Sequence, residues 1–88
     1  MMHNTKRIDL IRQKLQNALN PTLLEIADES YLHKGHIGAK SGAGHFALTI
    51  TASQLNNLSK VAAHQLIYSA LADMIPTEIH ALKIKIQS

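Results

Sequence analysis

The stretch Glu29-Ser-Tyr-Leu-His-Lys-Gly-His-Ile-Gly-Ala-Lys-Ser-Gly-Ala-Gly-His-Phe46 contains all four glycines of the chain and three of its six histidines. It separates two segments that are typical of β-strands, residues 23–28 and 46–51. A turn of two residues is enough to join antiparallel strands, so this connection is unusually long. Long connections in compact domains are usually functional or disordered. We therefore expect two paired strands, with functional residues in the connection between them.

The segment that follows this stretch alternates between apolar and more polar residues. Phe46, Leu48 and Ile50 share one face, because successive side chains of a strand point to opposite sides. The preceding strand, residues 23–28, has a similar apolar face. The two strands are therefore predicted to form an antiparallel hairpin with one face on the core.

A first helix is predicted before the hairpin. Asn4 or Thr5 could cap its start, and Asn20-Pro21 should end it, since the residue before a proline is disfavoured in helical geometry. Its apolar residues recur at helical spacing: Ile8, Ile11, Leu15, Ala18 and Leu19.

A second helix should begin after the cap residue Ser59 and run to about Met74, before Pro76. Its apolar residues cover more than one stripe, which predicts a well-buried helix. The last strand, Ile79–Ile86, alternates again. In this alternation His80 falls on the apolar side of the strand. Because it stands at the beginning of the strand, we expect it at the rim of the sheet.

The predicted order is helix, strand, strand, helix, strand. Two helices on one face of a three-stranded sheet is the simplest α+β packing for this αββαβ order. Eighty-eight residues form one domain, so we expect a single domain over residues 1–88. The opposite face of the sheet is less apolar and should be partly open.

The composition excludes several classes of function. The chain has no cysteine, which excludes disulfides, thiol catalysis and any thiolate metal site made by this chain alone. Nine basic against six acidic residues give a net charge of +3, a weak indication of an acidic partner. The sequence has neither a signal-peptide core nor a membrane-spanning apolar run. We expect a soluble, cytoplasmic protein that does not contact membranes.

Histidines are the candidate metal ligands, because imidazole suits zinc, copper, iron and nickel. No local zinc-binding spacing occurs, so each histidine can also be interpreted as a surface or structural residue. Serines, carboxylates and histidines are present, but nothing in the sequence holds them in a catalytic arrangement. We therefore expect no catalytic residues and no enzymatic activity. The candidate ligands are His33, His36, His45, His64 and His80.

Two segments of the sequence are relevant to nucleic-acid binding. Gly35-His36-Ile37-Gly38 matches the GxxG clamp of KH domains, but it would join two strands here, whereas the clamp joins two helices. The second helix offers Lys60 and His64 as candidate nucleic-acid contacts, which is little positive charge for phosphate binding.

Several short motifs together resemble those of the BolA-like proteins, over about residues 8–86. They occur in the family's order and spacing: Asp28-Glu29-Ser30, His33, Gly44-His45-Phe46, His64 with Ile67-Tyr68, and Ile79-His80-Ala81-Leu82. The long connection is similar to that of the BolA type proper.

The resemblance implies a class II KH-like fold with the same αββαβ order, and a protein that is not an enzyme. Family members pair with a monothiol glutaredoxin and share a [2Fe-2S] cluster with it and with glutathione, in iron–sulfur trafficking or iron regulation. By motif the metal ligands would be His33 and His80, with His36 as an alternative loop ligand. No cluster is expected in the isolated chain, which would be an apo monomer or a weak homodimer.

The resemblance also implies an alternative function. Bacterial members are described as DNA-binding transcriptional regulators of stress response or cell shape, which would use the KH-like surface. The family usually has arginines on both sides of the helix histidine, where this chain has Ala63 and Gln65. We therefore expect nucleic-acid binding to be weak.

Overall fold

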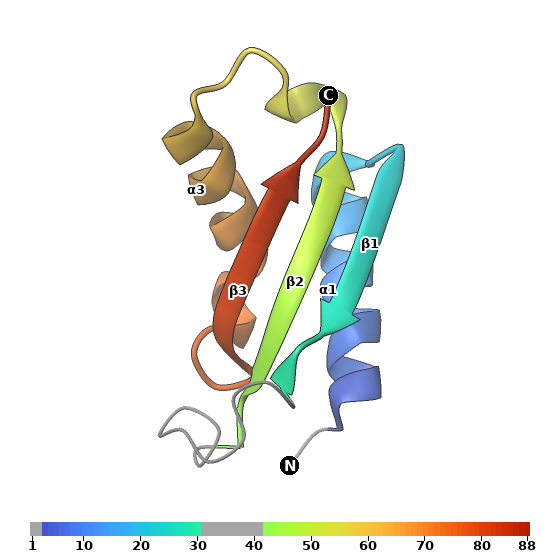
Figure 1. Cartoon of the computed structure of the whole chain (residues 1–88), viewed down its shortest axis with the longest axis vertical. Helices are drawn as coiled ribbons and strands as arrows, with labels where there is room; N and C mark the ends of the chain where they lie inside the picture. The colour runs from blue at the N-terminus through green and yellow to red at the C-terminus, as the bar shows by residue number, and fades with distance from the viewer. Residues whose placement is uncertain (1–2, 31–41) are drawn as a thin grey trace.

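The structure is a computed structural model that describes residues 3–30 and 42–88. Figure 1 shows a twisted sheet with two helices behind it. The order of elements is α1 (Asn4–Leu19), β1 (Leu23–Asp28), β2 (Gly44–Thr51), η2 (Ser53–Leu55), α3 (Lys60–Ala70), η3 (Ala72–Met74) and β3 (Ile79–Ile86). The predicted α+β class and the αββαβ order are confirmed.

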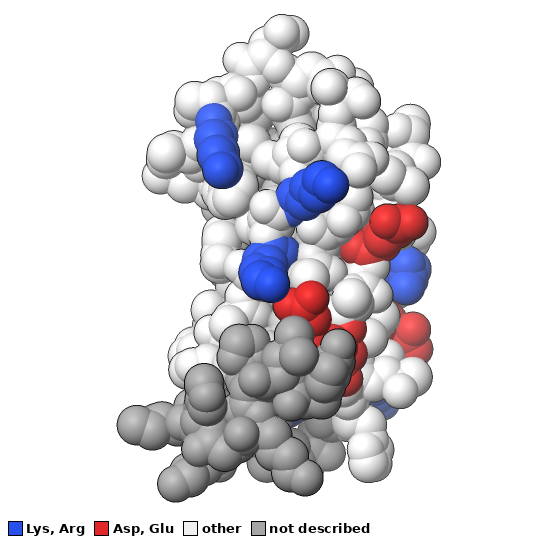
Figure 2. Space-filling model, viewed as in Figure 1, with Lys and Arg blue, Asp and Glu red and all other residues white. Residues whose placement is uncertain are grey.

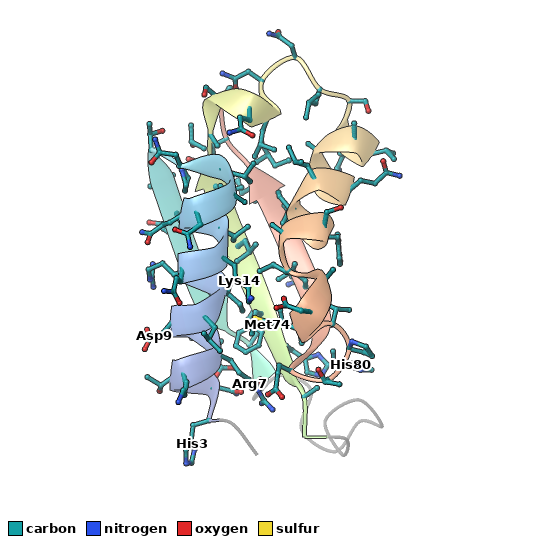
Figure 3. The ribbon with its side chains drawn as sticks, turned by 180° about the vertical axis from the view of Figure 1, so that it is seen from behind. His3, Arg7, Asp9, Lys14, Met74 and His80 are labelled. Carbon is teal, nitrogen blue, oxygen red and sulfur yellow. The ribbon has the colours of Figure 1, made fainter. Side chains whose placement is uncertain are left out.

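The sheet has the order β1-β2-β3. β1 pairs antiparallel with β2, so the predicted hairpin is confirmed, and β3 pairs parallel with β2. A parallel neighbour needs a crossover, which α3 supplies. Seen from behind in Figure 3, both helices lie in front of the sheet, so they cover the same face. β3 is left as an edge strand.

The core lies between the helices and the sheet. Phe46, Leu48 and Ile50 of β2 are almost completely buried, as their shared face predicts. Burial of each such side chain contributes on the order of 1.5–3 kcal/mol relative to exposure. The helical segments and the first residue of β3 contribute further side chains to the core: Ile11, Leu15, Leu19, Ala63, Ile67, Leu71, Met74 and Ile79.

The start of α1 differs from the prediction. His3 is the N-cap residue and makes no side-chain capping bond, whereas Asn4 and Thr5 are already helical. The reason is that the Asn4 side chain is used for long-range bonds to Asp28 and Ser30. The end of the helix agrees with the prediction, at Asn20 in the left-handed conformation that asparagine tolerates.

The start of α3 agrees with the prediction, since the Ser59 hydroxyl accepts a hydrogen bond from the Ala62 N–H at 3.1 Å. The prediction of a helix continuing to about Met74 was wrong, because α3 ends at Ala70 and the chain tightens into η3. Burial on more than one stripe was also wrong. Only one side of α3 meets the core, and Val61 on another side is 67% exposed.

The pairing of β2 with β3 is irregular where it begins. Gly44 is opposite Ile79, but His45 is opposite Ala81, so His80 is an extra residue on β3. This bulge places Ile79 in the core and leaves His80 exposed, although its sequence parity belongs to the apolar side. The expected rim position of His80 is confirmed.

Candidate functional site

His80 stands at the beginning of β3 beside a second histidine. The ring of His45, on β2, lies with its centroid 5.1 Å from that of His80, and the two planes are tilted by 51°. His45 is 5% exposed, whereas His80 is open to solvent. Figure 3 shows His80 at the lower right of the molecule, below α3. One histidine of the pair is thus accessible and the other is packed against it.

The sequence did not single out this pair. His45 was one of five candidate ligands, and the family pattern favoured His33 together with His80. Contact between His45 and His80 depends on the parallel register of β2 and β3 and on the bulge, which local sequence patterns do not specify. One signal in the sequence could have pointed to this pair. It is the alternation that places His45 at the start of a strand.

Two predicted site residues, His33 and His36, lie outside the described residues. Within residues 3–30 and 42–88, no group of three or more histidine or carboxylate side chains could hold a metal ion. The described residues therefore offer two neighbouring imidazoles, and a complete metal site would need further ligands from elsewhere.

A buried arginine connects α1 to the chain just before β3. Arg7 is 4% exposed, and its Nε donates to the Glu78 carboxylate at 2.8 Å. Its Nη1 donates to the Asn4 side-chain oxygen, also at 2.8 Å. Figure 3 shows Arg7 low in the molecule, in the same region as His80. Because the Gly44 N–H donates to the Glu78 carbonyl, this network reaches the first residue of β2 as well.

The same network holds the end of β1. The Asn4 amide donates to Asp28 Oδ2 at 3.0 Å and to the Ser30 hydroxyl at 3.1 Å. The Ser30 hydroxyl also accepts from the His45 backbone N–H at 3.0 Å, and the Glu29 N–H donates to the His45 carbonyl at 2.8 Å. The backbone of His45 is therefore fixed by the end of the neighbouring strand.

Asp28 is electrostatically tuned by this arrangement. Partial burial alone would raise the pKa of its carboxyl group. Hydrogen bonds from Ser30 and Asn4, together with the positive charge of Arg7, outweigh that effect and lower the pKa. Asp28 is therefore a carboxylate at neutral pH, as a hydrogen-bond acceptor in this network must be.

The candidate nucleic-acid contacts lie elsewhere on the molecule. Lys60 and His64 line a groove of about 400 Å³ between α3 and the second half of β3, together with Lys85. Figure 2 shows basic side chains in a row over β3 and the neighbouring end of α3, whereas acidic ones lie lower and toward β1. The structure thus brings Lys60 and His64 together and adds Lys85, which the sequence alone did not connect with them.

Comparison with known proteins assigns the chain and its fold to one family. The sequence profile described as BolA-like protein matches residues 15–88. The chain is 40% identical over 79 residues to SufE-like protein 1 of Arabidopsis thaliana. The match covers 84% of this chain and 21% of that protein. It is 37% identical over 75 residues to the DNA-binding transcriptional regulator BolA of Haemophilus influenzae, spanning 85% of this chain and 70% of that one. The chain belongs to the BolA-like protein family.

Solved structures agree with this assignment. The BolA domain of SufE1 from Arabidopsis thaliana superimposes with a TM-score of 0.79 at 36% identity, covering 99% of this chain and 93% of that one. This chain covers only 51% of the chloroplastic protein BOLA1 of the same plant. It thus spans about half or less of several relatives that it matches.

The names of these relatives include chloroplastic, mitochondrial and bacterial proteins, so they support no single compartment. None of the described helices has the length and apolar character needed to cross a membrane. The cytoplasmic location stays a prediction.

Proposed function

We propose that this chain is a non-enzymatic partner of a monothiol glutaredoxin, with which it shares a [2Fe-2S] cluster. His80 would supply one ligand and the loop histidine His33 a second, with His36 as the alternative. The cluster would serve iron–sulfur trafficking or iron regulation. The observation that carries the proposal is the exposed imidazole of His80, held on a strand and packed against the buried ring of His45.

The donor set of the chain fits this role. Imidazoles are good iron ligands, and two histidines on one iron with thiolates on the other is a known form of the [2Fe-2S] centre. The chain has no cysteine, so the thiolates would have to come from the glutaredoxin and from glutathione. When bound, the cluster would supply electron transfer or delivery of iron and sulfide.

Neighbouring residues of this chain would hold the metal-ligating side chain of His80 in position. The parallel pairing with β2 fixes the backbone at the start of β3, and the tilted ring of His45 supports the ring of His80 from one side. A side chain that is already ordered loses less conformational entropy when it binds a metal. Of the proposed ligands, His80 is therefore the one whose position is best fixed before the partner binds.

The test is visible circular dichroism of the complex with a glutaredoxin. His80→Ala should abolish the spectrum of the histidine-ligated cluster. His33→Ala should weaken it less if His36 can replace it, and the double variant at 33 and 36 should match His80→Ala. His64→Ala removes an imidazole from the groove beside α3 and is the matched control. An unchanged spectrum in His80→Ala would disprove the proposal.

The buried histidine needs a separate variant. His45→Phe keeps an aromatic ring against His80 and removes both ring nitrogens. If His45 only supports His80, the cluster spectrum should be retained in His45→Phe and weakened in His45→Ala. Equal loss in both variants would instead place His45 among the ligands.

A DNA-binding function is the second candidate, since Lys60, His64 and Lys85 line one groove. Two relatives also carry the name DNA-binding transcriptional regulator BolA. With so few cationic groups, we expect weak and non-selective binding. The slope of log K against log salt should be only about −1 to −2, since each phosphate contact contributes roughly −0.9. Fluorescence anisotropy that gave tight, sequence-selective binding at physiological salt would place this function first.

A further inference from the structure

Exposed apolar side chains gather along α3 and just before it. In the described part of the chain, the large apolar residues that stay exposed are Leu58, Val61, Leu66 and Tyr68. Single exposed apolar residues, such as Leu66, are common on protein surfaces. Leu58, Val61 and Tyr68 instead line two hollows beside α3, and apolar residues grouped at a hollow are typical of an interaction site. The histidine site does not account for these residues.

The groove beside them is lined by apolar and basic side chains. Leu58 and Ala63 line it on the helix side, Ile84 and Ile86 line it on the β3 side, and Lys60 and Lys85 line it as well. A second hollow of about 390 Å³ continues from it along α3, past Val61 to Tyr68. The two hollows are neighbours, because both are lined by Lys60 and His64.

The backbone along this groove is an open strand edge. β3 pairs with β2 on one side only, and successive residues of a strand direct their backbone groups alternately to the two sides. The Leu82 carbonyl faces outward, because it accepts a hydrogen bond from the Tyr68 hydroxyl at 3.2 Å. Ile84 and Ile86 have the same parity, so their N–H and C=O groups face the groove as well.

The charge around the groove has one sign. Lys60 and Lys85 line it, and no carboxylate is among the described residues that line it. Lys83 forms an ion pair with Glu29 at 3.2 Å, whereas Lys60 and Lys85 form none within the described residues. Two lysines that form no ion pair within the described residues, next to apolar side chains, favour an occupant that is both acidic and apolar.

We propose that the groove between α3 and β3 is a docking site for an extended, acidic segment of a partner protein. The segment adds to the sheet as a fourth strand beside Ile84 and Ile86. Main-chain hydrogen bonds hold it to the edge, alternate apolar side chains fill the space against Leu58 and Ala63, and its carboxylates pair with Lys60 and Lys85. This surface is separate from the histidine site, and the proposal does not depend on the function proposed above.

The groove suits a peptide better than a nucleic acid. A phosphate backbone needs several cationic contacts, and the groove provides two lysines and a histidine. Stacking of bases needs exposed aromatic rings, and Tyr68 is the aromatic residue that this surface offers. Aliphatic walls and an open strand edge are the features that a β-strand ligand uses.

The test is an NMR titration of the ¹⁵N-labelled full chain with a synthetic nonapeptide of alternating valine and glutamate. The amide resonances of Ile84 and Ile86 should shift most, followed by those of Lys60–His64, and both isoleucine amides should become protected from exchange. The same peptide with alternate backbone nitrogens methylated should bind at least tenfold more weakly. Absence of shifts at millimolar peptide, or equal binding of the methylated peptide, would overturn the proposal.

Two further measurements test whether binding depends on the charge of the groove and on the class of ligand. The double variant Lys60→Glu/Lys85→Glu should weaken peptide binding by roughly tenfold or more. Lys6→Glu/Arg12→Glu makes the same change of net charge on α1 and should leave the affinity unchanged. A single-stranded oligothymidine should bind more weakly than the acidic peptide. Tighter binding of the oligonucleotide in this groove, or equal effects of the two double variants, would contradict the proposal.

Discussion

At the scale of single residues, the contrast between two ion pairs tests how the histidine region is held. Arg7–Glu78 is buried on the arginine side, whereas Lys14–Asp73 is largely exposed. Arg7→Ala should lower the free energy of unfolding by on the order of 3 kcal/mol, because Glu78 and Asn4 lose their donor. Lys14→Ala, the control, should cost much less, because the exposed Asp73 carboxylate is solvated by water when its partner is removed. Urea unfolding measures both, and equal costs would contradict this interpretation.

Asp28 makes the stability of the chain depend on pH in the acid range. The pKa of its carboxyl group is lowered in the folded protein, so the folded state favours the charged form. Its stabilising contribution is complete above the unfolded-state pKa of ~3.9 and is lost as pH falls through the lower, folded-state pKa. The difference in stability between wild type and Asp28→Asn should therefore shrink below about pH 4.

Thermal unfolding at a series of pH values measures this difference. Asn4→Ala is an informative second background, because the Asn4 amide is one of the groups that lower the pKa of Asp28. In that background the pH dependence that Asp28 contributes should be smaller. A difference between wild type and Asp28→Asn that stayed constant from neutral pH to pH 2 would be evidence against this role.

At the scale of the elements, the start of β2 leaves no free space for a Cβ atom on Gly44. A Cβ atom on Gly44 would lie 2.5 Å from two ring carbons of Phe46 and 3.1 Å from the Asn4 side-chain oxygen. The Phe46 ring is buried and cannot move away freely. Gly44→Ala should therefore destabilise the protein by about 1–3 kcal/mol, the usual cost of overpacking a core.

A compensating variant separates this contact from other causes. Phe46→Leu removes the ring atoms closest to the added methyl group, so Gly44→Ala should cost less in the Phe46→Leu background than in the wild type. Chemical denaturation of the four proteins completes the double-mutant cycle. Additive costs would show that the Phe46 ring does not cause the strain.

At the scale of the whole molecule, the absence of cysteine determines what the chain can hold by itself. We expect anaerobic reconstitution of the isolated chain with iron and sulfide to give no [2Fe-2S] absorption. A cluster should form when a monothiol glutaredoxin and glutathione are added, because they supply the thiolates. The glutaredoxin alone with glutathione is the control. A stable cluster-loaded homodimer of this chain without added thiol would contradict the prediction.

The sequence by itself determined the class and order of the elements. Alternation in 23–28, 46–51 and Ile79–Ile86 and the helical spacing before Asn20 are local patterns, and each reflects a single element meeting the core. Ser59 likewise acts within one helix turn, so its role as a cap could be predicted. The resemblance identified the family for the same reason, since it rests on short motifs in a fixed order.

Only the tertiary structure decided which side chains meet. Asn4 was predicted as a cap, but is used instead by Asp28 and Ser30, far along the chain. The contact of His45 with His80 depends on a parallel register and a bulge. Which side of α3 is exposed depends on which side packs on the core, where Ala63 and Ile67 are buried. Local patterns specify how a segment folds. Contacts between distant segments depend on how the elements pack, which no single stretch of sequence encodes.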